Sequence, residues 1–325
     1  MTTMAGRHLC MGCGESLGSL LGGLFALSAT ASTEDGGGLD LRFNEPMKRH
    51  TTWQVGGPAE RFFRPRNRDE LFSFLRALEA ETPLFWLGGG SNLLVRDGGI
   101  AGVVITTAGA LESISLAGDG LVSVEAGASC ARLARFCQRS GLGGCEFLAG
   151  IPGTLGGALA MNAGAFGSEI WPLVAEVETV DRHGVVRWRP RADFRYGYRQ
   201  VEMPPGEWFL SARLQLQEAS EEARLRVREQ LAQRNRSQPM ADASAGSVFR
   251  NPPGDYAGRL IEACGLKGSR IGNAAVSERH ANFIVNLGGA KAADIEALIE
   301  AIEAEVLVRF GIPLEREVRI IGRAE

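Results

Sequence analysis

The stretch Leu87-Gly-Gly-Gly-Ser-Asn-Leu-Leu-Val95 decides the fold prediction, because it follows an apolar segment, 84–87, that predicts a buried strand. Three glycines directly after a strand let the backbone approach a ligand closely, since no Cβ stands in the way. Two similar stretches follow, Gly150-Ile-Pro-Gly-Thr-Leu-Gly-Gly-Ala158 and Met161-Asn-Ala-Gly-Ala-Phe-Gly167. Backbone N–H groups that converge in this way bind phosphate oxygens. The three stretches together predict a dinucleotide site.

The two familiar nucleotide-binding motifs are absent from the sequence. No Lys-Ser or Lys-Thr pair follows the glycines at the spacing of a P-loop. No GxGxxG lies between a strand and a helix with an acidic residue about 20 positions later, as a Rossmann fold requires. A single glycine cluster would favour the alternative of a tight turn. Because three clusters occur, and Ser91, Asn92 and Thr154 add side-chain donors, we favour a dinucleotide bound outside a Rossmann fold.

Composition sets the broad class of the protein. The 325 residues predict two domains, or one domain with a large elaboration. Hydrophobic residues (45%) and charged residues (22%) are in the range of globular proteins with a sizeable core. A net charge of −3 gives no electrostatic reason to expect nucleic acid as a partner. Six cysteines are too few for a disulfide scaffold, and with four histidines we expect no metal site.

The first 42 residues differ from the rest, and we expect them to form a disordered extension. Residues 16–33 carry no charge and contain an apolar patch followed by small residues, an order that resembles a secretory signal. A start codon assigned upstream of the true one and a peripheral membrane anchor are alternatives. The patch is short and glycine-rich for a transmembrane helix. Cys10 and Cys13 form a CxxC, but no second pair follows at zinc spacing.

Hydrophobic spacing outlines the remaining elements. A capping residue and Glu70 three positions later predict a helix that begins near Asn67. A polar, proline-containing stretch, 237–247, is the expected domain boundary. The other expected helices are 131–140, 221–236, 256–264 and 292–310, and the other expected strands are 103–105, 121–124, 174–180, 185–188, 208–216, 282–286 and 318–321, of which 174–216 forms an antiparallel sheet.

From about residue 51 to 322 the chain resembles the UDP-N-acetylenolpyruvoylglucosamine reductase family. The resemblance rests on the glycine stretches and on further motifs: Thr52-Trp-Gln-Val-Gly-Gly-Pro58, Tyr196-Gly-Tyr-Arg199, Ala245-Gly-Ser-Val-Phe-Arg-Asn-Pro252, Leu260-Ile-Glu262, His280-Ala-Asn-Phe-Ile-Val-Asn286 and Leu314-Glu-Arg-Glu-Val-Arg-Ile-Ile-Gly322. The interval from Tyr198 to Ser247 leaves no room for the extra tyrosine-bearing insertion of the longer subclass. The chain therefore resembles the compact type.

The resemblance implies an α+β fold: an FAD-binding domain of the vanillyl-alcohol-oxidase (PCMH) type with two α+β subdomains, and a C-terminal α/β substrate-binding domain. The implied first subdomain is 43–110, completed by the C-terminal strand 312–325. The implied second subdomain is 111–220, and the substrate-binding domain is 221–311. Only the extension, 1–42, lies outside the domains.

The family reaction implies roles for three residues. NADPH reduces a non-covalently bound FAD, and a hydride then passes to the enolpyruvyl group of a UDP-sugar to give UDP-N-acetylmuramate. Arg199 and Glu317 match the electrostatic pair beside the developing negative charge. Ser247 matches the donor of the proton. Without the resemblance, Arg199 would be a surface residue, Ser247 a turn residue and Glu317 an exposed strand carboxylate.

The resemblance also implies binding residues. Tyr198, Arg250, Asn251 and Asn286 are expected at the substrate, although the two asparagines could instead cap turns. Arg250 stands where relatives commonly have lysine, and the two cations bind phosphate differently. His280 is more consistent with a structural role than with a catalytic one. The residues expected to bind FAD are Leu87, Gly88, Gly89, Gly90, Ser91, Asn92, Leu93, Gly127, Gly150, Ile151, Pro152, Gly153, Thr154, Gly156, Gly157, Ala158, Asn162, Ala163, Gly164 and Ala165.

Two other functions compete with the reductase. An FAD-dependent oxidase of the same fold superfamily often attaches its flavin covalently, and Cys145 lies close to Gly150. A sensor that binds flavin or UDP-sugar without catalysis would have lost Arg199, Ser247 or Glu317, and all three are present. We expect a cytoplasmic monomer that binds only small molecules, with neither nucleic acid nor membrane as a partner.

Overall fold

The computed structural model describes residues 38–239 and 242–324. The fold described below is carried by Leu39–Glu325. The signal-like segment, the CxxC and the predicted disorder lie outside the described residues. The boundary predicted at residue 42 is wrong, because strand β1 (Asp40–Pro46) begins at Asp40 and pairs with β2. The extension therefore ends before Leu39.

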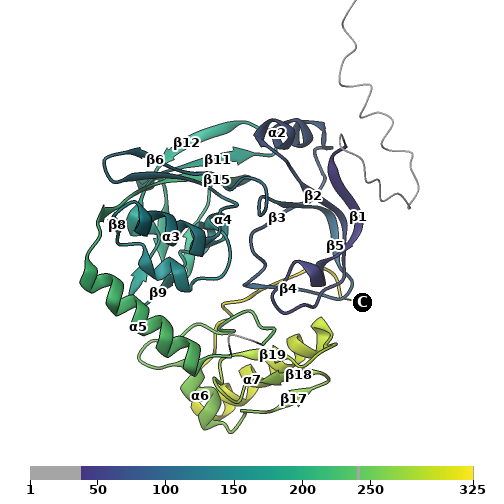
Figure 1. Cartoon of the computed structure of the whole chain (residues 1–325). Coiled ribbons are helices and arrows are strands. Elements are labelled where there is room, and N and C mark those ends of the chain that lie inside the picture. Colours follow the sequence, from purple (N-terminus) through teal and green to yellow (C-terminus); the bar gives the residue numbers. More distant parts are fainter. Residues whose placement is uncertain (1–37, 240–241, 325) are drawn as a thin grey trace, which may run out of the picture. The chain divides into compact units, whose positions relative to one another are not determined.

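The first sheet mixes antiparallel and parallel pairing. Its strand order is β1-β2-β5-β3, with β1 antiparallel to β2 and the other two pairs parallel (Figure 1). Helix α2 (Arg68–Ala77) begins as predicted, with the Asn67 side chain accepting a hydrogen bond from the Glu70 N–H. Leu71, Phe74 and Leu75 on this helix pack into the core. The remaining bounds are β2 (Pro58–Arg64), β3 (Leu84–Leu87), β4 (Leu93–Val95), β5 (Ile100–Thr106) and the short helix η2 (Met47–Arg49).

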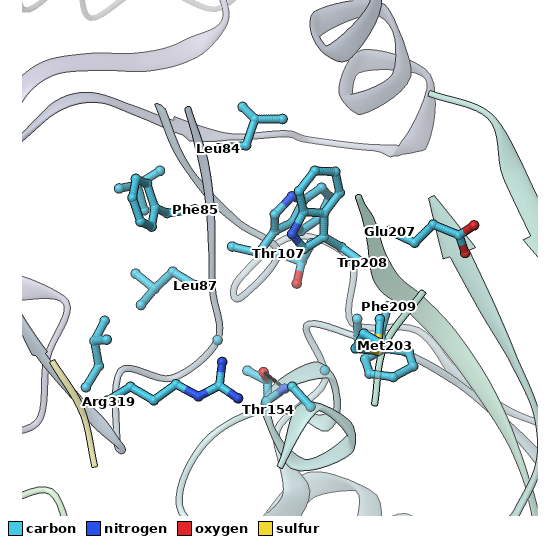
Figure 2. Close-up of a pocket in the computed structure, with 18 of the residues that line it drawn as sticks. Leu84, Phe85, Leu87, Thr107, Thr154, Met203, Glu207, Trp208, Phe209 and Arg319 are labelled. Carbon is cyan, nitrogen blue, oxygen red and sulfur yellow. Dashed lines mark hydrogen bonds between the residues drawn. The ribbon is translucent and has the colours of Figure 1, made fainter. Parts of the chain in front are cut away.

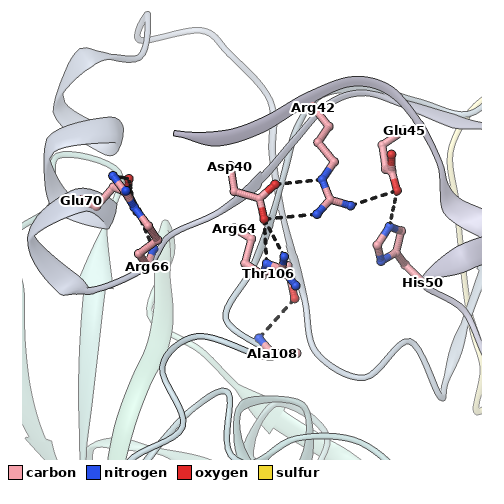
Figure 3. A network of polar contacts seen from close by, with 9 residues as sticks. All are labelled: Asp40, Arg42, Glu45, His50, Arg64, Arg66, Glu70, Thr106 and Ala108. Atoms are coloured by element: carbon pink, nitrogen blue, oxygen red, sulfur yellow. Dashed lines mark hydrogen bonds and ion pairs between the residues drawn. The ribbon is translucent and has the colours of Figure 1, made fainter. Parts of the chain in front are cut away.

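A polar network holds the edge strand β1 in place (Figure 3). The Asp40 carboxylate accepts hydrogen bonds from Arg42 Nε and Arg64 Nε, each at 2.8 Å. Burial disfavours the Asp40 carboxylate, but the two arginines outweigh that effect and hold its pKa below the usual range. His50 Nε2 lies 2.8 Å from the carboxylate of Glu45, which is itself buried. The residues that the sequence assigned to the extension thus anchor the first sheet.

The second sheet is antiparallel, as predicted, with order β12-β11-β15-β7-β6. Its core surrounds the fully buried Trp171, and helices α3 and α4 pack into the same core. The strands are β6 (Ile114–Gly118), β7 (Leu121–Glu125), β11 (Val174–Asp181), β12 (Val186–Pro190) and β15 (Glu207–Gln215), and the helices are α3 (Cys130–Arg139) and α4 (Leu155–Ala160). Shorter elements are β8 (Leu142–Gly143), η3 (Glu146–Gly150), β9 (Gly164–Ala165), β10 (Ser168–Glu169), η4 (Trp171–Leu173), η5 (Arg191–Asp193), β13 (Arg195–Gly197), β14 (Gln200–Glu202) and β16 (Gln217–Glu218).

The C-terminal region packs helices on a small sheet, around a core that also contains Trp53, Val55 and Leu94 from the N-terminal part of the chain. Helix α7 (Ala292–Phe310) has the predicted bounds, and it ends at Gly311, which adopts a φ of 68°. The other elements are α5 (Glu221–Ser237), α6 (Ala257–Ala263), β17 (Arg270–Ile271), β18 (Ala274–Val276), β19 (Ile284–Asn286) and β20 (Arg319–Ile321). The last strand, β20, leaves this region and pairs in parallel with β4. The division into two subdomains and a substrate-binding domain stays a prediction.

The described residues contain neither a membrane-spanning helix nor a cluster of metal-binding side chains. None of their helices combines the length and apolar character needed to cross a membrane. No group of three or more His, Cys, Asp or Glu side chains within 38–239 and 242–324 could hold a metal ion.

Deletion of β1 tests the corrected boundary. A variant that lacks residues 1–46 loses the Asp40–Arg64 ion pair and the contribution of Leu41 to the core. We expect its Tm to lie roughly 5 °C or more below that of a variant lacking 1–38, because a shift of that size corresponds to about 2 kcal/mol in a domain of this length. Thermal unfolding followed by circular dichroism measures the difference. Equal Tm values would show that β1 adds no stability.

Candidate active site

The first two glycine stretches meet backbone against backbone. A Cβ on Gly89 would lie 2.6 Å from the Cα of Gly153, and a Cβ on Gly88 would lie 2.8 Å from Thr154 Oγ1. Any larger residue would therefore separate the two turns, which follow β3 and precede α4. The Ser91 hydroxyl donates a hydrogen bond of 3.0 Å to the Pro152 carbonyl across the contact. Between the turns lies a cavity of about 160 Å³.

The backbone N–H groups of these turns are open to a ligand. Among the described residues, the N–H groups of Gly88 to Asn92, and those of Gly153 and Thr154, donate to no protein acceptor. Several backbone donors that converge on one space suit a ligand with several acceptor atoms. A pyrophosphate supplies such oxygens. The turns thus fit the phosphates of the dinucleotide that the sequence predicts.

A larger cavity, of about 590 Å³, continues from the phosphate-sized one (Figure 2). The two share Leu87, Gly88, Thr154, Gly157 and Arg319 among their lining residues. Aromatic side chains form much of its wall, including Trp86 and Trp208, whose rings stack with centroids 5.4 Å apart. In Figure 2 the Arg319 side chain points toward Thr154. An apolar wall with a cation at one end suits the base, sugar and phosphate of a nucleotide.

A third cavity, of about 220 Å³, adjoins the glycine turns and contains the predicted catalytic residues. Ser91, Asn92, Ile151 and Pro152 line both this cavity and the phosphate-sized one. Arg199, Ser247 and Glu317 come from three segments far apart in the sequence, and all three line the third cavity. Three connected cavities thus lead from an apolar nucleotide-sized space, past open N–H donors, to a charged centre.

Arg199 and Glu317 form the charged centre. Arg199 lies in the two-residue turn between β13 and β14, where its backbone adopts a φ of 55°. Its Nε donates a hydrogen bond of 3.1 Å to Glu317 Oε1, and the side chains are only 17% and 14% exposed. Burial raises the pKa of Glu317 above its usual range, and the charges of Arg199 and Arg250 only partly offset the effect of burial. Glu317 therefore holds a proton more readily than a surface carboxylate does.

Ser247 lies in the loop between α5 and α6, which Asn282 holds from behind. The backbone carbonyl of Asn282 accepts from the Val248 N–H at 2.9 Å, and its side-chain oxygen accepts from the Phe249 N–H at 3.0 Å. Its side-chain nitrogen donates to the Phe249 carbonyl at 2.8 Å. Asn282 is buried, and the sequence analysis assigned it no role. Only its place in the motif that begins at His280 could have indicated its importance. The Asn282 backbone nitrogen lies 3.3 Å from His280 Nδ1, which is a structural contact.

Of the four predicted substrate residues, two line the third cavity and two do not. Tyr198 and Asn251 line the third cavity, although the Asn251 side-chain oxygen also accepts from the N–H of Ala257, at the start of α6. Arg250 donates to the Arg199 carbonyl at 3.1 Å and pairs with Glu315 at 3.4 Å. The side chain of Asn286 is occupied elsewhere: its nitrogen donates to the Trp53 carbonyl, and its oxygen accepts from two N–H groups of the following loop.

Most of the predicted cofactor residues line these cavities or one beside them. A fourth cavity, of about 440 Å³, borders Gly164, Ala165, Arg199 and Ser247. Three of the predicted residues do not line any of the four: Gly127, Gly150 and Asn162. Gly127 instead lets its backbone pack closely against Thr107, because a Cβ there would lie 2.0 Å from the Thr107 carbonyl oxygen. The side chain of Asn162 is fully buried.

Comparisons with known proteins agree with this geometry. Residues 59–189 match the FAD binding domain family, and residues 238–321 match the C-terminal domain of UDP-N-acetylenolpyruvoylglucosamine reductase. A curated reductase of that name from Alkalilimnicola ehrlichii is 59% identical over 287 residues, which cover 88% of this chain and 96% of the relative. The chain belongs to the UDP-N-acetylenolpyruvoylglucosamine reductase family. A second relative of the same name, from Methylococcus capsulatus, is 56% identical and covers 87% of this chain and 93% of its own length.

A crystal structure extends the likeness to three dimensions. The reductase of Thermus caldophilus superposes with a TM-score of 0.75 at 37% identity, and it covers 87% of this chain and 98% of its own. The predicted family, the fold class and FAD as cofactor are confirmed. The oxidase alternative is not favoured by these relatives. Cys145, the residue considered for covalent attachment, is 1% exposed and packs in the core of the second sheet.

Gly157 offers a test of the flavin site that does not disturb the protein itself. A Cβ on Gly157 meets no protein atom closer than 3.8 Å, whereas Gly153 has a φ of 110° that any side chain would strain. Because Gly157 lines both nucleotide cavities, we expect Gly157→Val to weaken FAD binding at least tenfold while the Tm of the apoprotein changes little. Fluorescence titration of FAD measures the affinity, with Gly157→Ala as the graded comparison. Unchanged affinity in both variants would exclude Gly157 from the site.

Proposed function

We propose that the chain is an NADPH-dependent flavoenzyme that reduces UDP-N-acetylglucosamine enolpyruvate to UDP-N-acetylmuramate, a step in the synthesis of peptidoglycan precursors. The observation that carries the proposal is the position of Arg199, Ser247 and Glu317 around one cavity that adjoins the open N–H donors of the glycine turns. Because its substrates are small cytoplasmic molecules, we place the activity in the cytoplasm and expect a monomer.

FAD, when bound, would supply the hydride chemistry between NADPH and the methylene carbon of the enolpyruvyl group. The open N–H groups of Gly88 to Asn92, with those of Gly153 and Thr154, would hold its pyrophosphate, and the aromatic cavity would take its adenosine. The glycine turns share Ser91 and Asn92 with the charged cavity, so a ligand held there reaches the cavity of Arg199.

The charged pair acts on the neighbouring carbon and its carboxylate. When the hydride arrives, negative charge develops there, and a cation in a site shielded from water stabilises it more strongly than in solution. The Arg199 guanidinium meets both conditions, since it is mostly buried and fixed by Glu317. Glu317 holds the guanidinium in place, and burial raises the pKa of its carboxyl above the usual range.

Ser247 completes the reaction by donating a proton to that carbon. A serine hydroxyl is a weak acid, so the role requires a fixed position within reach of the carbon that receives the proton. Ser247 is half-buried, and the hydrogen bonds of Asn282 to Val248 and Phe249 fix its loop. The loop also meets the charged pair directly, because the Glu317 N–H donates to the Val248 carbonyl at 2.8 Å.

Substrate-dependent oxidation of NADPH tests the function. The purified chain should carry one FAD and consume NADPH in stoichiometric amounts only when UDP-N-acetylglucosamine enolpyruvate is present. Absorbance at 340 nm under nitrogen, with mass analysis of the product, measures this. NADPH-dependent consumption of oxygen alone, with flavin remaining in an acid-precipitated pellet, would favour the oxidase.

Ser247→Ala should separate the two half-reactions. Reduction of the flavin by NADPH needs no proton donor to the sugar, so its rate should stay close to that of the unchanged chain. Reoxidation by saturating substrate should slow by a factor of about 10² or more, the usual scale for a lost general acid. Stopped-flow traces of flavin absorbance give both rates. If only the substrate concentration at half-saturation rises, Ser247 shapes the loop and does not donate the proton.

A further inference from the structure

Asn162 has its hydrogen-bonding groups engaged inside the protein. Its side-chain nitrogen donates to the Gly197 carbonyl at 2.9 Å and to the Glu169 carboxylate at 2.7 Å. Its side-chain oxygen accepts from the Trp171 N–H at 3.2 Å. The residue is fully buried and lines none of the four cavities described above. Because both N–H groups already have acceptors, the amide has no donor left for a cofactor.

The carbonyl that Asn162 holds lies at the start of the turn that presents Arg199. Gly197 is the last residue of β13, and Tyr198 and Arg199 form the two-residue turn to β14. Arg199 has a φ of 55°, which residues other than glycine adopt at a cost and keep only where the surroundings enforce it. The hydrogen bond from Asn162 to the Gly197 carbonyl is such a constraint, since it fixes the peptide on the entry side of the turn.

The same segment also holds the other end of Arg199. One terminal nitrogen of the guanidinium donates to the Gly164 carbonyl at 2.7 Å, and the other lies 3.5 Å from the Asn162 carbonyl. The two contacts leave Nε directed at Glu317. The segment from Asn162 to Gly164 therefore holds both the backbone of the turn and the tip of the arginine.

We propose that Asn162 is a positioning residue for the reduction, acting through the Gly197 carbonyl to hold Arg199 against Glu317, and that its side chain is not a ligand of FAD. This inference rests on the proposed function, because it concerns the arginine that stabilises the developing charge. It replaces the role that the sequence analysis gave to Asn162.

Two variants remove the amide in different ways. Asn162→Asp keeps the shape and removes both donors, while Asn162→Gly removes the side chain and suits the φ of 47° at this position. Glu169→Gln is the matched control, because its amide oxygen can still accept from Asn162. The unchanged chain, measured in parallel, distinguishes failure of the proposed function from failure of the proposed role of Asn162. If the enolpyruvyl substrate does not reoxidise the flavin of the unchanged chain, the proposed function itself is wrong.

We expect both Asn162 variants to bind FAD within about twofold of the unchanged chain and to be reduced by NADPH at a similar rate. Reoxidation by saturating substrate should slow by a factor of about 10 to 100, with Glu169→Gln close to normal. The pH profile of reoxidation should also move. Arg199 lowers the pKa of Glu317, so loosening Arg199 in the neutral variant Asn162→Gly should shift the limb of the profile that reports Glu317 to higher pH.

Three results would overturn the proposal. Tenfold weaker FAD binding with a normal rate of reoxidation in the loaded variants would make Asn162 a cofactor ligand. A normal rate of reoxidation and an unchanged pH profile in the Asn162 variants would show that the Asn162 side chain does not position Arg199. Failure of both variants to fold, with Glu169→Gln folded, would show that the amide holds the core of the second sheet rather than the turn.

Discussion

The contact between Gly89 and Gly153 is the constraint on which the other parts of the site depend. It requires two turns from different sheets to approach until a single Cβ would collide with the opposite backbone. Because the turns are that close, their N–H groups face one shared space and remain open to a ligand. The first turn continues into β4, which pairs with β20, so the same contact also fixes the strand that follows Glu317.

Glu317 is where three segments that line the third cavity join. The Asn92 side chain donates to its carbonyl at 3.0 Å, its own N–H donates to the Val248 carbonyl, and its carboxylate accepts from Arg199. The backbone of Glu317 thus links the first glycine turn to the Ser247 loop, and its side chain links both to the hairpin of Arg199. Glu317 thus fixes the spacing between Arg199 and the Ser247 loop, because it contacts both segments.

Local patterns in the sequence predicted the elements well, because caps and hydrophobic spacing are local. Helix α2 begins after the Asn67 cap, and α7 has the predicted bounds. The catalytic residues were predicted from a resemblance in motifs, and spacing alone would have left them as surface or turn residues. The contacts that Asn282 and Asn162 make could not be predicted, because their side chains bond to backbone 33 or 35 residues away, which no local pattern encodes. Strand β1 was not predicted for a related reason, since its pairing with β2 and the Asp40–Arg64 contact span a loop.

Two sets of ion pairs outside the site join the regions of the protein. Arg68 on α2 ties the first sheet to Glu125 and Glu178 of the second sheet, and Arg96 forms a forked ion pair with Glu296 of α7. These joints lie outside the lining of the charged cavity. At that cavity, Arg199 donates a hydrogen bond to Glu317, and Arg250 donates one to the Arg199 carbonyl. Residues of the site therefore connect the β13–β14 hairpin to the C-terminal region. An anionic substrate in this cavity would lie close to the positive charges of Arg199 and Arg250. The ion pairs of Arg68 and Arg96 meanwhile hold the two sheets and α7 together. The charged pair is also tied to the first glycine turn, because the Asn92 side chain donates to the Glu317 carbonyl.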